Sequence, residues 1–146
     1  MAKLSPYNYC LYLLGNREHS VHQISQKLKA REVDGTEIFR CIEKLQTHKL
    51  QSDERFCESM IRYHSNQLKG EQWIKHSLKQ AGVSGDQIEN AFYASEVNWF
   101  DVLQTLINKK YGDTPAVDFK ETQKRKRYLV GKGFGYGLIN EVLSDR

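Results

Sequence analysis

The sequence has few of the residues that break helices or cross-link chains. It contains two prolines in 146 residues and three cysteines, Cys10, Cys41 and Cys57, at wide spacings. An odd number of distant cysteines argues against a disulfide scaffold and is typical of a reduced chain inside the cell. With so little proline, long periodic segments can remain helical without interruption. We therefore expect an all-α protein with free thiols.

Long apolar runs are also absent. No stretch approaches the roughly 20 apolar residues that a membrane-spanning helix needs. The mean hydropathy is −0.67, and the opening residues contain no apolar signal-peptide segment. These absences predict a cytoplasmic chain with no membrane partner. No apolar surface stripe remains after the core positions are assigned, so we expect a monomer.

The sequence does contain a repeat of about 50 residues, which is visible in the spacing of its apolar residues. Three sets of four residues share the steps five, five and four: Leu28, Val33, Ile38 and Ile42; Leu78, Val83, Ile88 and Phe92; and Leu129, Phe134, Ile139 and Leu143. Apolar residues four apart share a helix face, whereas a step of five crosses a turn. Ile24 and Ile74 stand four residues before the first two sets, and Arg125 stands at this place in the third.

The residues around each predicted turn agree with a helix-turn-helix unit. Asp34, Ser84 and Gly135 follow the apolar residue of the turn, and all three types are favoured as helix N-caps. Gly82 and Gly133 precede it and suit the left-handed position at which helices end. The first unit has Glu32 at that place.

A further helix is expected before each pair, over residues 6–15, 53–68 and 97–111. The fold is then three tandem three-helix (helix-turn-helix-like) repeats, over residues 1–50, 51–95 and 96–146. A repeat of this size buries too little apolar surface to be stable alone, so the repeats should pack on one another. We expect an elongated, curved array, and the alternative is one globular bundle with coincidental spacing.

Four short motifs are spread over nearly the whole chain. They are Arg-Glu-His-Ser at 17–20, Asp-Glu-Arg-Phe at 53–56, Lys-Lys-Tyr-Gly at 109–112 and the segment 126–134. Each resembles a motif of the bacterial RecX family, and Asp-Glu-Arg-Phe is the most specific of them. The chain departs from the family at Gly131 and Gly135, where basic and polar residues are more frequent.

The resemblance implies a non-enzymatic regulatory protein that acts on the recombinase RecA. Such a protein binds RecA filaments on DNA, lies in the groove of the filament, and mostly inhibits RecA ATPase, strand exchange and coprotease activity. Its setting is DNA repair, homologous recombination and the SOS response. Two alternatives stay open. One is a DNA-binding module of tandem helix-turn-helix repeats, and the other is a structural adaptor with no role on nucleic acid.

Positive charge is concentrated in one segment, between residues 120 and 132. The segment holds six basic residues and one glutamate, whereas the whole chain has a formal charge of +4. The basic residues are Lys120, Lys124, Arg125, Lys126, Arg127 and Lys132. Clustered Lys and Arg replace counterions on phosphate, so this segment could contact single- or double-stranded DNA. It could equally meet an acidic protein surface, or it could be only a solvated helix face.

A secondary basic track is expected if the repeats stack with a regular rotation. Its residues are Arg17, Arg55, Arg62, Lys69 and Lys75. Ordinary solvation explains exposed Lys and Arg just as well, so the track is a hypothesis.

No catalytic, cofactor or metal site is predicted. The segment Gly131–Gly133 lacks the spacing and the preceding strand of a phosphate-binding P-loop. His19 and His22 have no second pair at ligand spacing, and we expect both to be surface histidines. No nucleophile, base and acid set stands out.

Two other conspicuous sets have structural explanations. Asp53 and Glu54 suit the first turn of a helix, where the helix dipole favours acids. Trp73 and Trp99 could stack on bases, but aromatic residues at helical spacing more often pack between helices. We favour packing for both tryptophans.

Overall fold

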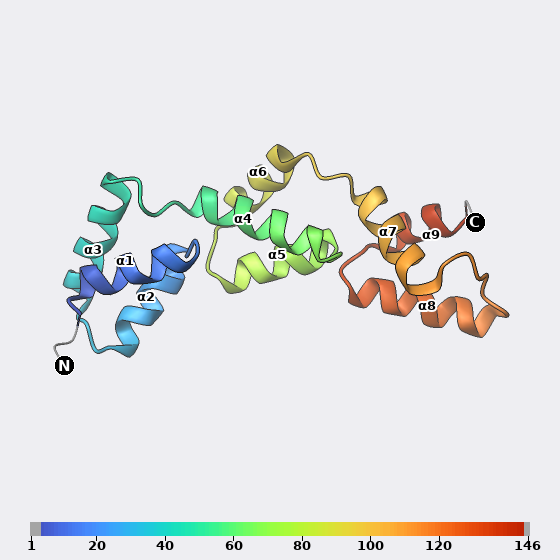
Figure 1. Cartoon of the computed structure of the whole chain (residues 1–146), viewed down its shortest axis with the longest axis horizontal. Coiled ribbons are helices and arrows are strands. Elements are labelled where there is room, and N and C mark those ends of the chain that lie inside the picture. Colours follow the sequence, from blue (N-terminus) through green and yellow to red (C-terminus); the bar gives the residue numbers. More distant parts are fainter. Residues whose placement is uncertain (1–3, 145–146) are drawn as a thin grey trace. The chain divides into compact units, whose positions relative to one another are not determined.

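The computed structural model describes residues 4–144, and over that range its regular secondary structure is entirely α-helical (Figure 1). The helices are α1 Pro6–Asn16, α2 Val21–Ala30, α3 Gly35–Thr47, α4 Asp53–Asn66, α5 Glu71–Gln80, α6 Gly85–Ser95, α7 Trp99–Tyr111, α8 Phe119–Gly131 and α9 Tyr136–Ser144. The predicted all-α class, with three consecutive groups of three helices, is confirmed.

The first five-residue step of each repeat spans the C-terminus of a helix. The amide of Val33 donates to the Leu28 carbonyl at 3.1 Å. The amides of Val83 and Phe134 donate in the same way to the carbonyls five residues earlier, each at 3.2 Å. This bond belongs to the Schellman motif, in which an apolar residue after the helix contacts one in its last turn. The spacing of five therefore reflects one turn geometry used three times.

The left-handed residue of each turn is present in all three repeats. Gly82 and Gly133 have φ of 79° and 105°, and Glu32 has φ of 62°. A left-handed conformation costs a residue with a Cβ about 1–2 kcal/mol. The first repeat therefore keeps the same turn although Glu32 lacks the conformational freedom of glycine, which would adopt this φ without that cost.

The predicted helix N-caps are also present. The Asp34 side chain accepts a hydrogen bond from the Glu37 amide at 2.9 Å, and the Ser84 hydroxyl accepts one from Gln87 at 3.3 Å. Ser20 and Gln23 form a reciprocal capping box at the start of α2. Each cap satisfies amides that have no partner inside their helix.

The helices form two compact units. The first unit comprises the chain through Ser59 together with Leu78–Ala91, and the second comprises Met60–Ser77 together with the chain from Phe92 onward. The boundaries fall inside α4, α5 and α6, so the middle group of helices contributes to both units. The repeat limits 1–50, 51–95 and 96–146 stay predictions.

Each unit has its own apolar core. The core of the first unit contains Cys10, Ile24, Leu28, Ile38, Cys41 and Leu45. The core of the second contains Leu103, Leu106, Ile107, Leu129, Phe134, Ile139 and Val142. Nine of the twelve apolar positions of the predicted repeat are buried, and the other three, Val33, Ile42 and Leu143, pack against these cores. Cys10, Cys41 and Cys57 are buried, and their thiols are free.

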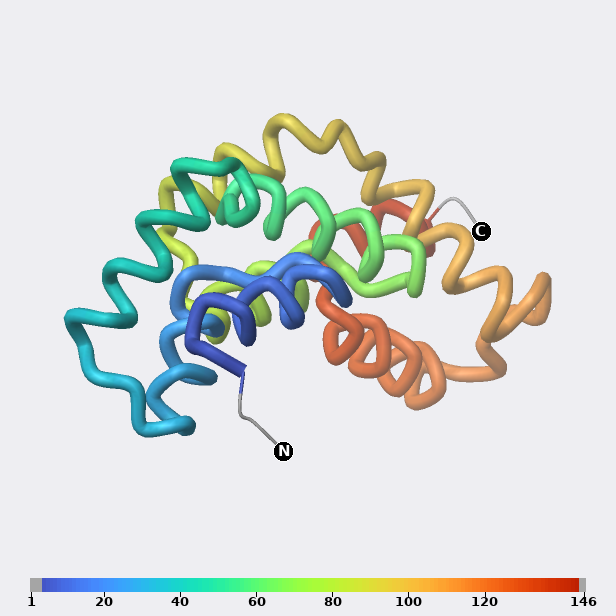
Figure 2. Tube along the Cα trace, turned by 60° about the vertical axis from the view of Figure 1, so that its left-hand side comes forward, coloured from blue at the N-terminus to red at the C-terminus, as the bar shows by residue number. Residues whose placement is uncertain are grey.

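The longest connection joins α7 to α8 in the second unit, and Figure 2 shows it as an extended segment between the two helices. It runs over residues 112–118. None of the helices between residues 4 and 144 has the length and apolar character of a bilayer span.

Candidate nucleic-acid interface

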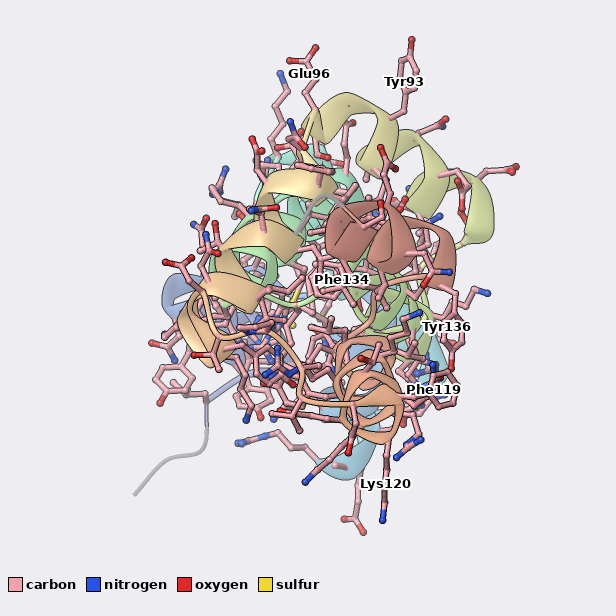
Figure 3. The ribbon with its side chains drawn as sticks, turned by 90° about the vertical axis from the view of Figure 1, so that its right-hand side faces the viewer. Tyr93, Glu96, Phe119, Lys120, Phe134 and Tyr136 are labelled. Carbon is pink, nitrogen blue, oxygen red and sulfur yellow. The ribbon has the colours of Figure 1, made fainter. Side chains whose placement is uncertain are left out.

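Helix α8 presents three exposed basic side chains on one face. Asp118 caps the helix by accepting a hydrogen bond from the Glu121 amide at 2.8 Å. Lys120, Lys124 and Arg127 are exposed, and steps of four and three residues place them along one side of a helix. Lys120 projects away from the helix into solvent (Figure 3). We call these three residues the α8 ridge.

Arg125 faces inward, unlike the ridge. It occupies the place in the repeat at which Ile74 is fully buried, and its own side chain is only 12% exposed. The guanidinium donates to the Thr114 carbonyl at 2.9 Å and to Glu121 at 3.0 Å. Its Cζ lies 4.2 Å from the centre of the Tyr111 ring. Arg125 therefore fastens the α7–α8 connection to α8.

Glu121 also holds the α7–α8 connection against α8. Its second carboxylate oxygen accepts a hydrogen bond from the Val117 amide at 2.8 Å. The Val117 amide first, and then Arg125, hold the pKa of Glu121 below its usual range. Glu121 thus binds both the connection and Arg125. The ion pair of Glu121 with Arg125 adds no net charge to the basic segment.

The remaining basic residues of the segment, Lys126 and Lys132, are half-buried. Lys132 is the C-cap of α8, directly after its last residue, and its carbonyl accepts a hydrogen bond from the Gly70 amide at 2.8 Å. Its ammonium lies 5.9 Å from the centre of the Tyr128 ring, and that of Lys110 lies 4.4 Å from the same ring. Helix α7 therefore brings a further cation to the end of α8, which linear charge counting did not single out.

The secondary track divides between the two units and is partly paired with acids. Arg55 lies 3.4 Å from Glu18 in the first unit, and Lys75 lies 3.4 Å from Glu71 in the second. The other members are Arg17, which is exposed, Arg62, which is exposed, and Lys69, which is half-buried. The track stays a hypothesis, and its paired members have less free charge than the α8 ridge.

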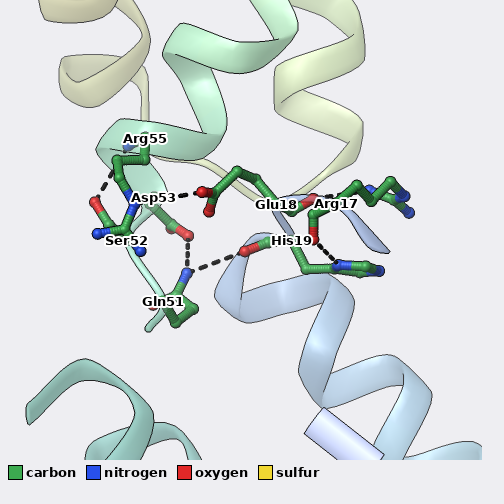
Figure 4. A network of polar contacts seen from close by, with 7 residues as sticks. All are labelled: Arg17, Glu18, His19, Gln51, Ser52, Asp53 and Arg55. Atoms are coloured by element: carbon green, nitrogen blue, oxygen red, sulfur yellow. Dashed lines mark hydrogen bonds and ion pairs between the residues drawn. The ribbon is translucent and has the colours of Figure 1, made fainter. Parts of the chain in front are cut away.

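A polar network in the first unit explains two of the motifs that carry the family resemblance (Figure 4). Asp53 accepts hydrogen bonds from the Val21 amide and from Gln51 Nε2, each at 2.9 Å. Gln51, only 3% exposed, also donates to the His19 carbonyl at 3.2 Å. The first acid of Asp-Glu-Arg-Phe therefore caps α2 from a distance, a role that the sequence analysis missed.

The expectation of a surface histidine is wrong for His19, which is 3% exposed. Its Nδ1 donates to the Arg17 carbonyl at 3.0 Å, since a carbonyl oxygen can only accept. Burial lowers the pKa of His19, against the opposing effect of this hydrogen bond. His22 is exposed, as predicted.

The tryptophans lie against other side chains of the second unit. The Trp99 ring centre lies 5.9 Å from that of Phe92, and Trp73 lies 4.8 Å from His64. These contacts agree with packing. Between residues 4 and 144, no three His, Cys, Asp or Glu side chains come together in an arrangement that could hold a metal ion.

Comparison with known families matches the chain in three consecutive parts. Residues 7–45 match the description "RecX, first three-helix domain", residues 52–91 match "RecX, second three-helix domain", and residues 96–143 match "RecX, third three-helix domain".

Curated relatives match nearly the full length. "Regulatory protein RecX" of Actinobacillus pleuropneumoniae serotype 5b (strain L20) is 36% identical over 135 residues, covering 92% of this chain and 87% of the relative. The protein of the same name from Haemophilus ducreyi (strain 35000HP / ATCC 700724) is 33% identical over 136 residues, covering 92% and 87%.

Two solved structures share the fold. A crystal structure of regulatory protein RecX aligns with a TM-score of 0.79 at 24% identity, covering 97% of this chain and 72% of the other. That of RecX from Lactobacillus salivarius aligns with a TM-score of 0.76 at 24% identity, covering 96% and 93%.

Proposed function

Because the chain belongs to the RecX family of regulatory proteins, we propose that it is a non-enzymatic regulator that binds RecA filaments on DNA. It inhibits the RecA ATPase, strand exchange and coprotease activity, and so acts in homologous recombination, DNA repair and the SOS response. It works in the cytoplasm as a monomer and needs no cofactor.

The α8 ridge is the observation that supports this proposal most directly. Its three side chains are exposed and lie along one face of α8, whereas Arg125 on the same helix is paired with Glu121 and is largely covered. Cations arranged in this way replace counterions along a phosphate backbone. The ridge can therefore approach the DNA on which the recombinase is assembled.

In this proposal the protein inhibits RecA by binding alone, without a chemical step of its own. A ligand changes an equilibrium only through its different affinities for the states of its partner. Inhibition then requires tighter binding to an inactive filament conformation, or to filament ends, than to the active filament. The phosphate contacts of the ridge add affinity without sequence preference, since phosphates carry no base information.

The ATPase of RecA on single-stranded DNA tests the proposal. Increasing amounts of the wild-type chain should inhibit it at less than one chain per RecA. The ridge variant K120Q/K124Q/R127Q should need an about tenfold higher concentration for half inhibition, because three phosphate contacts are lost. The control K27Q/K29Q/R40Q removes the same charge from exposed positions of the first unit and should inhibit like the wild type.

Two results would overturn the proposal. A folded sample that fails to inhibit at molar excess, but prefers one duplex sequence well above random DNA, would be a DNA-binding module of helix-turn-helix repeats. A sample that neither inhibits nor shows any dependence on DNA at low salt would be a structural adaptor.

A further inference from the structure

The turns that follow α4 and α8 meet at two glycines within the second unit. The Gly70 amide donates to the Lys132 carbonyl at 2.8 Å, and the Gln72 amide donates to the Gly133 carbonyl at 3.0 Å. A Cβ on Gly70 would overlap the main chain of Gly133, so the two backbones are in direct contact. Lys69 and Lys132 each precede one of these glycines. The contact therefore fixes the two lysines as neighbours.

Aromatic rings lie beside the ammonium groups of these lysines. Lys69 Nζ lies 4.7 Å from the centre of the Trp73 ring. Lys132 Nζ lies 5.9 Å and Lys110 Nζ 4.4 Å from the centre of the Tyr128 ring. Three cations from three different segments thus collect around two rings. We call Lys69, Lys110 and Lys132 the lysine cluster.

The positive charge of the cluster is not paired with an acid among the described residues. Among the described residues, no carboxylate lies within the 4.0 Å ion-pair distance of any of its three lysines. The Lys132 side chain first, and desolvation second, lower the pKa of Lys69. Like charges held together are unfavourable in the free protein, and an anion between them relieves the repulsion.

Each of the two rings has at least one ammonium group within 6 Å of its centre. The ammonium groups of Lys110 and Lys132 both lie within 6 Å of the centre of the Tyr128 ring. The ammonium group of Lys69 lies as close to the centre of the Trp73 ring. Cations at this range are attracted to ring faces. The ammonium groups held beside the rings are the charge that a ligand meets here, so the ligand that this arrangement fits is an anion.

We propose that the lysine cluster binds a phosphate group of a nucleic-acid backbone, as a contact in addition to the α8 ridge. The inference rests on the proposed function, in which DNA is the surface that the protein approaches. Twelve residues of helix at 1.5 Å each place Lys132 about 18 Å along the axis from Lys120. Cations distributed over that length match a polyanion with regularly repeated charge better than they match one isolated carboxylate.

Anisotropy of a fluorescent oligothymidylate, measured with the full chain and without RecA, tests this contact. For single strands the logarithm of affinity changes by about 0.7 per phosphate contact for each logarithm of salt. Loss of this one contact is worth about fivefold in affinity at about 0.1 M salt, so K69Q and K132Q should each lose part of it and flatten the salt dependence by part of that slope. The double variant should lose more than either single variant.

A matched control is K79Q/K109Q, which removes two exposed lysines outside the cluster and should bind within about twofold of the wild type. An abasic oligonucleotide of the same length should bind the wild type as tightly as oligothymidylate, since the cluster contacts phosphate. Urea unfolding of each variant establishes that it is folded.

The outcome separates this proposal from the function on which it rests. If K69Q/K132Q is folded and binds the oligonucleotide with the wild-type affinity and salt slope, the phosphate site does not exist. If the same variant also loses inhibition of RecA, the cluster contacts an acidic protein surface instead, while the regulatory function stands. If the variant loses DNA affinity but the wild type never inhibits RecA, the site stands and the regulatory function fails.

Discussion

Asp53 accepts a hydrogen bond from the Val21 amide at 2.9 Å, so the first residue of α4 caps the first turn of α2. A buried glutamine, Gln51, donates to the same carboxylate oxygen and links it to the His19 carbonyl. The conspicuous acid of Asp-Glu-Arg-Phe therefore has an architectural role inside the first unit.

Replacing Asp53 by alanine should lower the free energy of unfolding by about 1–2 kcal/mol, because the amide of Val21 and the donor of Gln51 both lose their acceptor. Urea unfolding followed by circular dichroism measures the change. Glu54 is the matched control, since it is an exposed acid in the same first turn. E54A should change stability by less than about 0.5 kcal/mol, and an equal loss in both variants would refute the capping role.

Within the basic segment, stability and charge should separate by residue. R125A removes two hydrogen bonds and the contact with Tyr111 and should cost about 1–3 kcal/mol. K124A, one residue earlier and exposed, should cost less than about 0.5 kcal/mol. The urea midpoint should therefore fall further for R125A than for K124A. Equal midpoints would mean that Arg125 does not hold the connection.

The glycines near the end of α8 should respond oppositely to alanine. At Gly133, with φ of 105°, a Cβ would lie 2.5 Å from the Cβ of Trp73, so G133A should destabilise by about 2–4 kcal/mol. Gly131 is the last residue of the helix and a Cβ there meets nothing within 4 Å. G131A should therefore stabilise by about 0.5–1 kcal/mol. Thermal unfolding compares them, and a tolerated G133A would contradict the close backbone contact.

The buried His19 should make the fold sensitive to mild acid. Its pKa is lowered by burial, so the folded chain binds the proton less readily than the unfolded chain, in which a histidine has a pKa of about 6.5. The stability from neutral His19 is fully present above that pH and declines as pH falls through the folded pKa. Urea midpoints between about pH 5 and pH 8 should fall less steeply for H19N, whose amide can still donate to the Arg17 carbonyl.

His64 adds to the same dependence, since burial first and Lys69 second lower its pKa. H19N should therefore reduce the slope without abolishing it. A slope identical to that of the wild type would show that His19 is not the group that titrates.

The buried thiols should be unreactive in the folded chain. Burial, as the first cause, raises the pKa of Cys10 and of Cys57 to about 11, so little thiolate exists at neutral pH. A thiol reagent at about pH 8 should label all three cysteines in urea and react slowly with the native protein. Rapid labelling without denaturant would mean that the cores open readily.

The fold was predictable because its signals are local. The turn after Leu28 needs only an apolar residue five positions on and a residue that tolerates φ of 62°, and both lie within one segment of the sequence. The capping residues act within three positions of themselves. One chain segment thus contains the information for these turns and caps, and the apolar spacing adds the face that is buried. The start of α2 is an exception, because Asp53 of α4 also caps it from 32 residues away.

The candidate site was predictable only in part. Lys120, Lys124 and Arg127 lie on one face, as their spacing indicates, but Arg125 depends on the ring of Tyr111 and on a carbonyl in a loop. A count of charges along the segment cannot distinguish an arginine that is paired and covered from one that faces water. Lys69 and Lys132, far apart in sequence, become neighbours only through the backbone contact of two glycines.

The division of the chain into two units also bears on the order in which the protein is made. The first unit includes Leu78–Ala91, and the Ser20 hydroxyl donates to the Ala81 carbonyl at 2.7 Å. Domains generally fold as units during synthesis, the N-terminal domain first. Here the first unit is not complete until Ala91 has left the ribosome. By then Met60–Ser77 has also left it, but α7 to α9, which belong to the same unit as Met60–Ser77, have not yet been released. Translation therefore delivers the two units interleaved, and a nascent chain stalled between them would carry an unfinished piece of the second.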